Sequence, residues 1–447
     1  MKKTFVCIIS ILILLSMTLS SCVMSNDPDA IYKKIDKKMN KLRSYVADYA
    51  IDSVSYAGTT AIKTEGSGKI IVSGNVEDDF YYYDKATTDL SVGGKKQTVT
   101  TLEAYYNGKH YFSNTSLALG LSVYSESSAE DFAKYIEKIS SSEDTSFAEG
   151  EKKNFEKNED GGYTLEYSEY GTESIKKILN SYGFDQETFG TDVTDVNVKM
   201  ETDKKLCLKT MRIEFSFNKD GLVSSRMEPK FVYEMTYSDL NEAEPVTNEL
   251  KDGRFEKIED VSILRMLPKM IEDQAKAESG KFKVSTRQAV SSTAVNTSQS
   301  EDLEVSYNDY GDSYTYDIAT TIDKREYNIS YADGVAVTKS GSKETGRQKQ
   351  TEEEARKYIA TLAGIDVYNF ASVSSVSYEN GVYTFKLEGY TDESINAAFG
   401  GNLKHSTYTV KATVNGDKLE KLEANVRFDG MIQVWTIITV DRTITFE

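Results

Sequence analysis

The stretch Tyr81-Tyr82-Tyr83-Asp84-Lys85-Ala86-Thr87-Thr88 occurs a second time with few changes, as Tyr314-Thr315-Tyr316-Asp317-Ile318-Ala319-Thr320-Thr321. Tyrosine and threonine favour strands, and successive side chains of a strand point to opposite faces of the sheet. Each copy therefore predicts a strand in which some tyrosines face outward. Outward tyrosines suit a protein or glycan partner, although they are also ordinary strand formers.

Four further echoes follow in the same order along the chain. They are Lys134-Tyr135-Ile136 with Lys357-Tyr358-Ile359, Tyr163-Thr164 with Tyr383-Thr384, Tyr170 and Glu173-Ser174-Ile175 with Tyr390 and Glu393-Ser394-Ile395, and Asn218, Asp220 and Leu222 with Asn415, Asp417 and Leu419. The distance between the copies falls from 233 residues at the first echo to 197 at the last, as expected if loops are shorter in the second copy. Five echoes in one order predict a duplicated domain, and the alternative is two unrelated tyrosine-rich segments.

The repeat sets the predicted domain boundaries. The first domain covers residues 28–240, and the second covers residues 261–447. Residues 241–260 between them are acidic, contain Pro245 and lack clear periodicity. They therefore predict a linker.

Each predicted domain has the same order of elements. A leading helix is followed by a run of antiparallel strands, a middle helix, a strand, a short helix and two or three long strands. In the first domain, helices are expected from Pro28, over Ser128–Ile139 and over Thr172–Tyr182, and Asn107-Gly108 is typical of a hairpin turn. In the second domain, Val261–Ala277 is expected to be the leading helix.

Two polar stretches of the second domain are expected to be loops. Ser291–Asp302 and Thr338–Gln350 are polar stretches, and both predict loops. A helix is expected directly after the second stretch, because Thr351 and Glu354 have the spacing of a capping box.

This order of elements resembles the LolA/LppX-like lipoprotein fold. The resemblance implies an α+β fold made of two tandem copies of a curved antiparallel β-sheet, a half-open barrel, with helices packed in its mouth. In that family the sheet and the helices enclose an apolar cavity that takes acyl chains. An up-and-down β-barrel and a cystatin-like sheet wrapped on one helix are the competing folds.

The resemblance implies that the chain binds a lipid or another hydrophobic ligand. The lining would come from two adjacent strands of the first domain that place large apolar side chains on one face. These residues are Met211, Ile213, Phe215 and Phe217 on one strand, and Met227, Phe231, Tyr233 and Met235 on the next. The same pattern is typical of a hydrophobic core under the domain's own helices, so a ligand wall and a filled core remain alternatives.

The start of the chain indicates export. A positively charged beginning precedes the apolar run Phe5–Leu19, which is short for a membrane-spanning helix but typical of a signal peptide. Ser20-Ser21-Cys22 then resembles the lipobox of a bacterial lipoprotein. The resemblance implies that residues 1–21 are removed, that Cys22 carries the lipid and that residues 22–27 form a tether. The body is therefore expected to be extracytoplasmic and anchored to the cell membrane.

Composition and motifs exclude several functions. The chain has 71 acidic and 53 basic residues, giving a formal net charge of −18, so nucleic acid would be repelled. His110 and His405 belong to no catalytic or metal-binding motif and are expected to face solvent. Cys207 lies in a strand-like run and is expected to be packed there. The expectation is therefore a non-enzymatic protein without metal or cofactor.

Two functions remain. The first is a membrane-anchored extracytoplasmic lipoprotein that binds a lipid or other hydrophobic ligand in a cavity between sheet and helices. The alternative is a structural or interaction lipoprotein with solid cores, for example in an envelope complex or as an adhesin, whose partner is an envelope protein.

Overall fold

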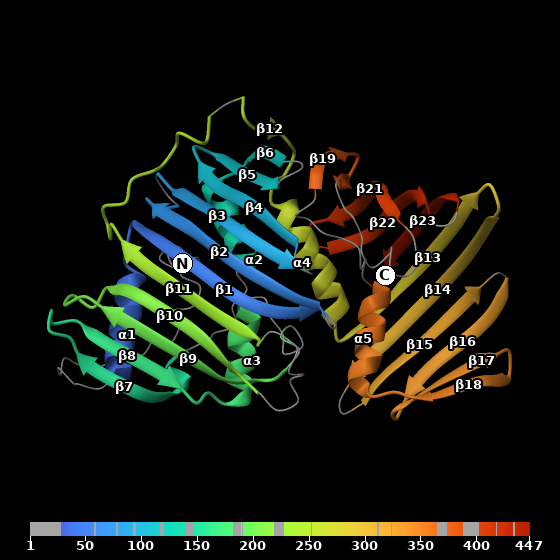
Figure 1. Cartoon of the computed structure of the whole chain (residues 1–447), viewed down its shortest axis with the longest axis horizontal. Coiled ribbons are helices and arrows are strands. Elements are labelled where there is room, and N and C mark those ends of the chain that lie inside the picture. The colour runs from blue at the N-terminus through green and yellow to red at the C-terminus, as the bar shows by residue number, and fades with distance from the viewer. Residues whose placement is uncertain are drawn as a thin grey trace. The chain divides into compact units, whose positions relative to one another are not determined.

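The structure is a computed structural model of the chain (Figure 1). It describes residues 28–447 except 58–59, 77–78, 93–94, 117–119, 140–146, 182–188, 190, 219–227, 252, 311–312, 323, 364–372, 388–401, 417 and 432–433. The expected signal, the lipid-attachment residue Cys22 and the tether lie outside the described residues. The described chain divides into two units, of which the first ends at Lys257 and the second begins at Ile258.

The first unit is built on a sheet with the strand order β12-β6-β5-β4-β3-β2-β1-β11-β10-β9-β8-β7. The sheet is antiparallel apart from the short parallel pair of β12 with β6. The strands are β1 (Tyr45–Ala57), β2 (Thr60–Ser73), β3 (Tyr81–Val92), β4 (Lys95–Tyr106), β5 (Lys109–Ser116), β6 (Gly120–Glu126), β7 (Glu151–Lys157), β8 (Tyr163–Ser168), β9 (Val193–Thr202), β10 (Leu208–Phe217), β11 (Lys230–Ser238) and β12 (Glu256–Lys257). The helices are α1 (Pro28–Met39), α2 (Ala129–Ile139) and α3 (Thr172–Ser181).

The second unit has a sheet with the strand order β18-β17-β16-β15-β14-β13-β23-β22-β21-β20-β19. Its strands are β13 (Ser279–Ser292), β14 (Asn296–Tyr310), β15 (Ser313–Ile322), β16 (Arg325–Ala332), β17 (Val335–Ser340), β18 (Lys343–Lys349), β19 (Val373–Glu379), β20 (Val382–Leu387), β21 (Asn402–Asn415), β22 (Lys418–Met431) and β23 (Trp435–Phe446). The described helices are α4 (Ile263–Lys276) and α5 (Glu352–Ala363).

Apart from β12, the two sheets have the same strand order, with β1–β11 corresponding one by one to β13–β23. In each unit, six strands run in succession from the middle of the sheet to one edge. The chain then crosses to the other edge and returns through five strands, so that the first and last strands pair at the centre. Two copies of one domain would have this topology, although the duplication itself stays a prediction.

The expected fold class is wrong. With 62% strand and 17% helix, the protein is mostly β rather than α+β. The expected half-open barrel with helices packed in its mouth is also wrong, because both sheets are open and the described helices are few and small. The physical reason is that short hairpin turns join long strands directly, which leaves few residues for helices. The helices that do form have room only to cover part of a sheet.

Two stretches that were expected to be loops are strands. Ser291–Asp302 spans the hairpin of β13 and β14, and Thr338–Gln350 covers much of β17 and β18. Most side chains in these strands are exposed, so the alternation of apolar and polar residues that reveals a half-buried strand is missing. Their backbones are nevertheless paired, for example Ser291 with Asn296.

Two short sequence motifs predicted the local structure correctly. Asn107 and Gly108 join β4 to β5 with positive φ angles of 51° and 73°, so the predicted hairpin turn is confirmed. The predicted capping box of α5 is confirmed too. Glu354 N donates to Thr351 Oγ1 at 3.2 Å, and Thr351 N donates to Glu354 Oε2 at 2.8 Å.

The three helices of the first unit lie on one face of its sheet (Figure 1). Each helix buries one apolar stripe: Ile31, Ile35 and Met39 from α1, Phe132 and Ile136 from α2, and Ile178 and Leu179 from α3. Burial of these stripes is what holds short helices in place, because isolated helices of this length are marginal in water. We call this side of the sheet the helix-covered face.

On the opposite face, one end of the sheet packs against the segment between β11 and β12, residues 240–255, which we call the strap and which runs along the margin of the sheet in Figure 1. Ala243 and Leu250 of the strap are buried in one cluster with sheet residues Val46, Ile71, Tyr81, Tyr83, Leu102, Ala104 and Tyr111. The Tyr81 hydroxyl donates to Val246 O at 2.6 Å and accepts from Val246 N at 3.0 Å. The segment expected to be a linker is therefore attached to the first sheet at a few residues, while most of its side chains are exposed.

Candidate functional site

The apolar wall expected from the sequence lies on the helix-covered face of the first sheet. Met211 and Ile213 of β10 pair directly with Met235 and Tyr233 of β11. Met211, Ile213, Phe215, Phe231 and Met235 are buried, Phe217 and Tyr233 are half-buried, and Met227 lies outside the described residues. The strand pairing therefore brings the described members of the wall together.

One end of this wall is filled by a side chain that the sequence did not single out. Phe189 is fully buried, and its ring centroid lies 6.0 Å from Phe215, 5.0 Å from Phe217 and 6.4 Å from Phe231. Phe215 and Phe231 stack on each other at 4.3 Å. This end of the wall is a solid core. Phe189 was missed because it lies in a stretch without periodicity.

The middle of the wall, where β11 lies beside β1, is partly accessible. Tyr233 of β11 stacks on Tyr49 of β1 with ring centroids 6.1 Å apart, and both tyrosines are half-buried. Ile51, opposite Tyr233, is half-buried as well. Burial raises the pKa of Tyr233 well above its ordinary value, so its hydroxyl stays protonated. We call Tyr49, Ile51 and Tyr233 the aromatic ledge.

A glycine makes room for the ledge. Gly68 of β2 lies directly opposite Tyr49 in the sheet. A Cβ atom at Gly68 would lie 2.3 Å from the Tyr49 ring, which is far inside van der Waals contact. The Tyr49 ring therefore lies across the glycine, where no side chain holds it away from the sheet.

Polar groups begin next to the ledge. The Tyr49 hydroxyl donates to Asp84 Oδ1 at 3.1 Å, and the Tyr82 hydroxyl lies 3.5 Å from Asp84 Oδ2. Asp84 is half-buried, so its carboxylate is within reach of solvent. Asp84 of β3 lies directly opposite Glu103 of β4.

Glu103 belongs to a buried hydrogen-bonded group under α2. His110 Nε2 lies 2.8 Å from Glu103 Oε1, and the Tyr135 hydroxyl donates to the same oxygen. The His110 ring also packs against Phe132, with centroids 4.8 Å apart. His110 is 2% exposed, so the expectation that it faces solvent is wrong. It points inward because it pairs with Tyr105 on the helix-covered face.

Tyr49, Asp84, Glu103, His110 and Tyr135 thus form a polar strip within an otherwise aromatic layer. Buried charged and polar groups cost free energy unless they are hydrogen-bonded to one another. Hydrogen bonds join Tyr49 to Asp84, and join Glu103 to His110 and Tyr135, while Asp84 and Glu103 are neighbours across the two strands. A polar strip beside a partly accessible apolar ledge is the arrangement that orients a ligand with both apolar and polar parts.

The second unit allows the strip to be compared with an equivalent position. Its β16–β17 hairpin turns at Asp333-Gly334, with positive φ angles of 51° and 76°, as the β4–β5 hairpin does at Asn107-Gly108. Ala336 is the second residue after the turn in the second unit. His110 is the second residue after the turn in the first, so the two positions correspond.

Counting residues from the two hairpin turns also identifies the counterparts of the carboxylates Glu103 and Asp84. Glu103 lies four residues before its hairpin turn, and Ile329 lies four residues before the other turn. Asp84 pairs with Glu103, and Ile318 pairs with Ile329. The second unit therefore has Ile, Ile and Ala where the first has Asp, Glu and His.

The repeated sequence around Asp84 and Asp317 did not reveal that the second unit lacks these polar residues. It aligns Asp84 with Asp317, but Asp317 is exposed, and its neighbour Ile318 occupies the position equivalent to Asp84. A shift of one residue along a strand exchanges the two faces of the sheet. The echo is therefore one residue out of register with the fold at this strand.

The other candidate residues of the sequence lie apart from the ledge and the strip or outside the described side chains. Cys207 is half-buried in the turn before β10, and burial raises the pKa of its thiol, which makes it less reactive. The His405 side chain lies outside the described residues. Among the described residues, no three His, Cys, Asp or Glu side chains are grouped as a metal site requires. In the described part of the chain, no helix is long and apolar enough to cross a membrane.

Comparison with known proteins adds little. No family model matches the chain, and no curated protein matches it. A LolA superfamily protein from Nitrosomonas europaea is similar at 10% identity and a TM-score of 0.16, over 40% of this chain and 93% of its own. A DUF3598-family protein of unknown function from Nostoc punctiforme is similar at 7% identity and a TM-score of 0.15, over 91% of this chain and 96% of its own. At such TM-scores, neither likeness carries a functional argument.

Proposed function

We propose that the chain is a membrane-anchored extracytoplasmic lipoprotein whose first unit binds a lipid or other hydrophobic ligand at the aromatic ledge. The observation that carries this proposal is the half-buried, stacked pair Tyr49–Tyr233 beside the middle of an apolar wall. Stacked aromatic rings provide a large apolar surface at low cost in side-chain entropy. The neighbouring Asp84 gives the ligand site a polar edge.

The membrane anchor and the lack of enzyme activity are expected from the sequence alone, and both remain parts of the proposal. Cys22 would hold the protein on the outer side of the cell membrane through its lipid. No enzyme activity and no cofactor are included. The membrane, a lipid or hydrophobic small molecule and an envelope protein are the proposed partners, and nucleic acid is excluded from them by the net charge of −18.

Native mass spectrometry tests the ligand. Residues 22–447 with Cys22→Ser carry no acyl chain of their own, so any lipid that co-purifies is bound non-covalently. Tyr49→Ala and Tyr233→Ala should each reduce the retained lipid and weaken displacement of a fluorescent fatty acid. Tyr106→Ala, at an exposed tyrosine of the same sheet, is the matched control and should bind as the parent does. A parent protein that is folded, free of lipid and unable to bind the fatty acid would refute the proposal.

One observation favours the alternative of an interaction lipoprotein. Phe189 fills one end of the wall, so at least that part of the first unit is solid core rather than cavity. In this case the working surfaces would lie outside, facing an envelope protein. Cross-linking in cells distinguishes the two functions, because an interaction protein should yield a specific protein neighbour even when Tyr49 and Tyr233 are replaced.

A further inference from the structure

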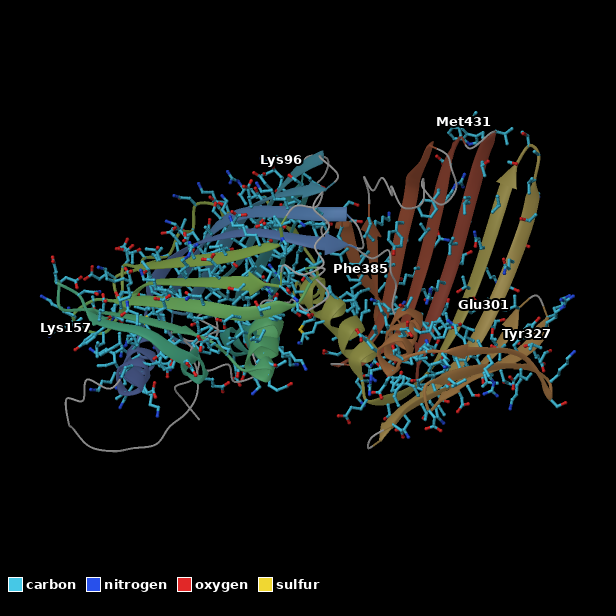
Figure 2. The ribbon with its side chains drawn as sticks, turned by 60° about the horizontal axis from the view of Figure 1, so that its bottom comes forward. Lys96, Lys157, Glu301, Tyr327, Phe385 and Met431 are labelled. Carbon is cyan, nitrogen blue, oxygen red and sulfur yellow. The ribbon has the colours of Figure 1, made fainter. Side chains whose placement is uncertain are left out.

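One end of the second sheet exposes three large apolar side chains. Val295 lies in the turn between β13 and β14, while Met431 and Trp435 flank the turn between β22 and β23. Their exposed fractions are 49%, 52% and 55%. Met431 and Trp435 are direct partners across the two strands, and Figure 2 shows Met431 at the far end of the sheet. Trp435 is also the only tryptophan of the chain.

The two turns lie at the same end of the sheet because β13 pairs with β23. Ser291 lies opposite Ile437, and Ser292 lies opposite Thr436. The exposed side chains of both turns are thereby gathered at one place, which we call the apolar tip and define as Val295, Met431 and Trp435.

Hydrogen bonds hold the described backbone beside these side chains. Ser292 N donates to Val295 O at 2.7 Å, and Val295 N donates to Ser292 Oγ at 2.9 Å. Beside Trp435, the Thr436 hydroxyl donates to Val434 O at 3.0 Å. The exposure of Val295 is therefore a property of a hydrogen-bonded turn, and Met431 and Trp435 are exposed as paired strand residues.

Charge is absent from the sequence around the tip. Residues 288–300 and 430–440 contain no Asp, Glu, Lys or Arg, although 28% of the chain is charged. The first charges on β13 and β23 are Arg287 and Asp441, which lie opposite each other. At the rise of a β-strand, Asp441 is about 20 Å along the strand from Trp435.

We propose that the apolar tip inserts into the interfacial region of a lipid bilayer. A protein-binding surface usually has a polar and partly charged rim, whereas a bilayer excludes charge from the depth that a protein penetrates. Interfacial elements reach about 5–10 Å into the headgroup and acyl boundary. Over this depth β13 and β23 carry no charge, while Asp429 of β22, about 7 Å along the strand from Met431, limits how far the tip inserts. Tryptophan favours this region because its ring is apolar and its N–H is polar.

The net charge decides which lipids are favoured. At −18, the chain is repelled by anionic headgroups, so the tip should bind neutral bilayers better than anionic ones. This contact is independent of the proposed ligand at the aromatic ledge. It would give the protein a membrane contact in addition to the expected lipid on Cys22.

The single tryptophan provides the test. Residues 22–447 with Cys22→Ser lack both the apolar signal and an acyl chain, and Trp435 then reports on the tip alone. On mixing with phosphatidylcholine vesicles, Trp435 emission should shift to shorter wavelength, and lipids brominated on the acyl chains should quench it. Added anionic lipid should weaken the effect.

Two double variants complete the test. Val295→Asp with Met431→Asp keeps Trp435 and should weaken vesicle binding about tenfold or more. Val246→Asp with Tyr378→Asp makes the same charge change at exposed apolar residues elsewhere and should bind as the parent does. Far-UV circular dichroism confirms that all are folded. Unchanged Trp435 emission with vesicles, or equal binding by both double variants, would overturn the proposal and point to a protein partner for the tip.

Discussion

His110 and Glu103 form a hydrogen bond at the centre of the first unit, with 2.8 Å between Nε2 and Oε1 and no more than 3% exposure of either residue. At the equivalent positions the second unit has Ala336 and Ile329, which lie on the neighbouring strands β17 and β16 of the same topology. The shared strand order therefore forms with or without polar groups at these positions. The polar strip is an addition to the first unit and needs an explanation beyond folding.

Replacing Glu103 alone should be strongly destabilising. Glu103→Leu removes the oxygen that His110 and the Tyr135 hydroxyl share, and it leaves two polar groups in a layer of aromatic rings. Removing one partner of a buried polar group typically costs about 3 kcal/mol. Urea unfolding followed by circular dichroism should show the first unit losing about this much stability. Glu166→Leu, at a less buried glutamate of the same sheet, should have a much smaller effect.

Replacing Asp84, Glu103 and His110 together should restore most of the loss. The triple variant Asp84→Ile, Glu103→Ile and His110→Ala gives the first unit the residues of the second. An apolar set of suitable volume avoids the cost of desolvating charged groups, although the Tyr135 hydroxyl loses the Glu103 oxygen. The stability of the triple variant should therefore lie about 1 kcal/mol below the parent, well above that of Glu103→Leu. Binding of the proposed ligand should fall even so. A triple variant as unstable as Glu103→Leu would show that the strip is required for folding.

The strip also shows how far the sequence could lead. Alternating patterns predicted strands, and the face shared by Met211, Ile213 and Met235 was identified correctly because the period of two is unambiguous there. The echo around Asp84 aligned the wrong faces, because similar residues one position apart outweighed the hairpin register. Register depends on which strands pair, and a single chain segment does not contain that information.

Two other features of the fold could not be predicted from local patterns in the sequence. The strap has no periodicity because it is held by scattered contacts, such as Leu250 in the sheet cluster, rather than by a repeated stripe. Phe189 lies in a stretch that was expected to be irregular, and it becomes a core residue only through contacts with Phe215 and Phe231. In both cases the partners are remote in sequence, so only the folded chain reveals them.

The strap should loosen when Tyr81 loses its hydroxyl. Tyr81→Phe removes both hydrogen bonds to the Val246 backbone, which should cost about 1 kcal/mol and raise the population of detached strap about fivefold. Trypsin can then cut at the exposed residues Lys251 and Arg254, and the rate of cleavage measures the detachment. Tyr106→Phe is the control at a neighbouring exposed tyrosine. Equal cleavage of both variants would mean that apolar contacts alone hold the strap.

The close approach of Tyr49 to Gly68 predicts an unusually sensitive glycine. Gly68→Ala would place a Cβ atom 2.3 Å from the Tyr49 ring, so the ring must move and its hydrogen bond to Asp84 must lengthen. We expect a loss of about 1–3 kcal/mol in unfolding free energy, together with weaker binding of the proposed ligand. Gly346→Ala is the matched strand control, because its nearest atom would be 3.6 Å away. Equal stability of the two variants would contradict the packing described for the ledge.

Asp36 should make the first unit less stable as the pH rises. Burial on α1 raises the pKa of its carboxyl to about 6, above its ordinary value of 3.8. The folded chain therefore holds this proton more tightly than the unfolded chain does. The resulting stabilisation is complete below pH 3.8 and is lost as the pH rises through 6. Since the side chain is only half-buried, solvent screening should limit the effect to about 1 kcal/mol.

Replacing the carboxyl isolates this effect. Asp36→Asn cannot ionise, so it should be more stable than the parent at pH 7.5 and equal to it at pH 4, as measured by urea midpoints at both values. Asp192→Asn removes an exposed carboxylate from the same unit and should leave the pH dependence unchanged. If Asp36→Asn and the parent differ equally at both pH values, the change reflects packing or a hydrogen bond to Asn40 rather than the proton. The raised pKa would then not be a source of pH-dependent stability in this helix.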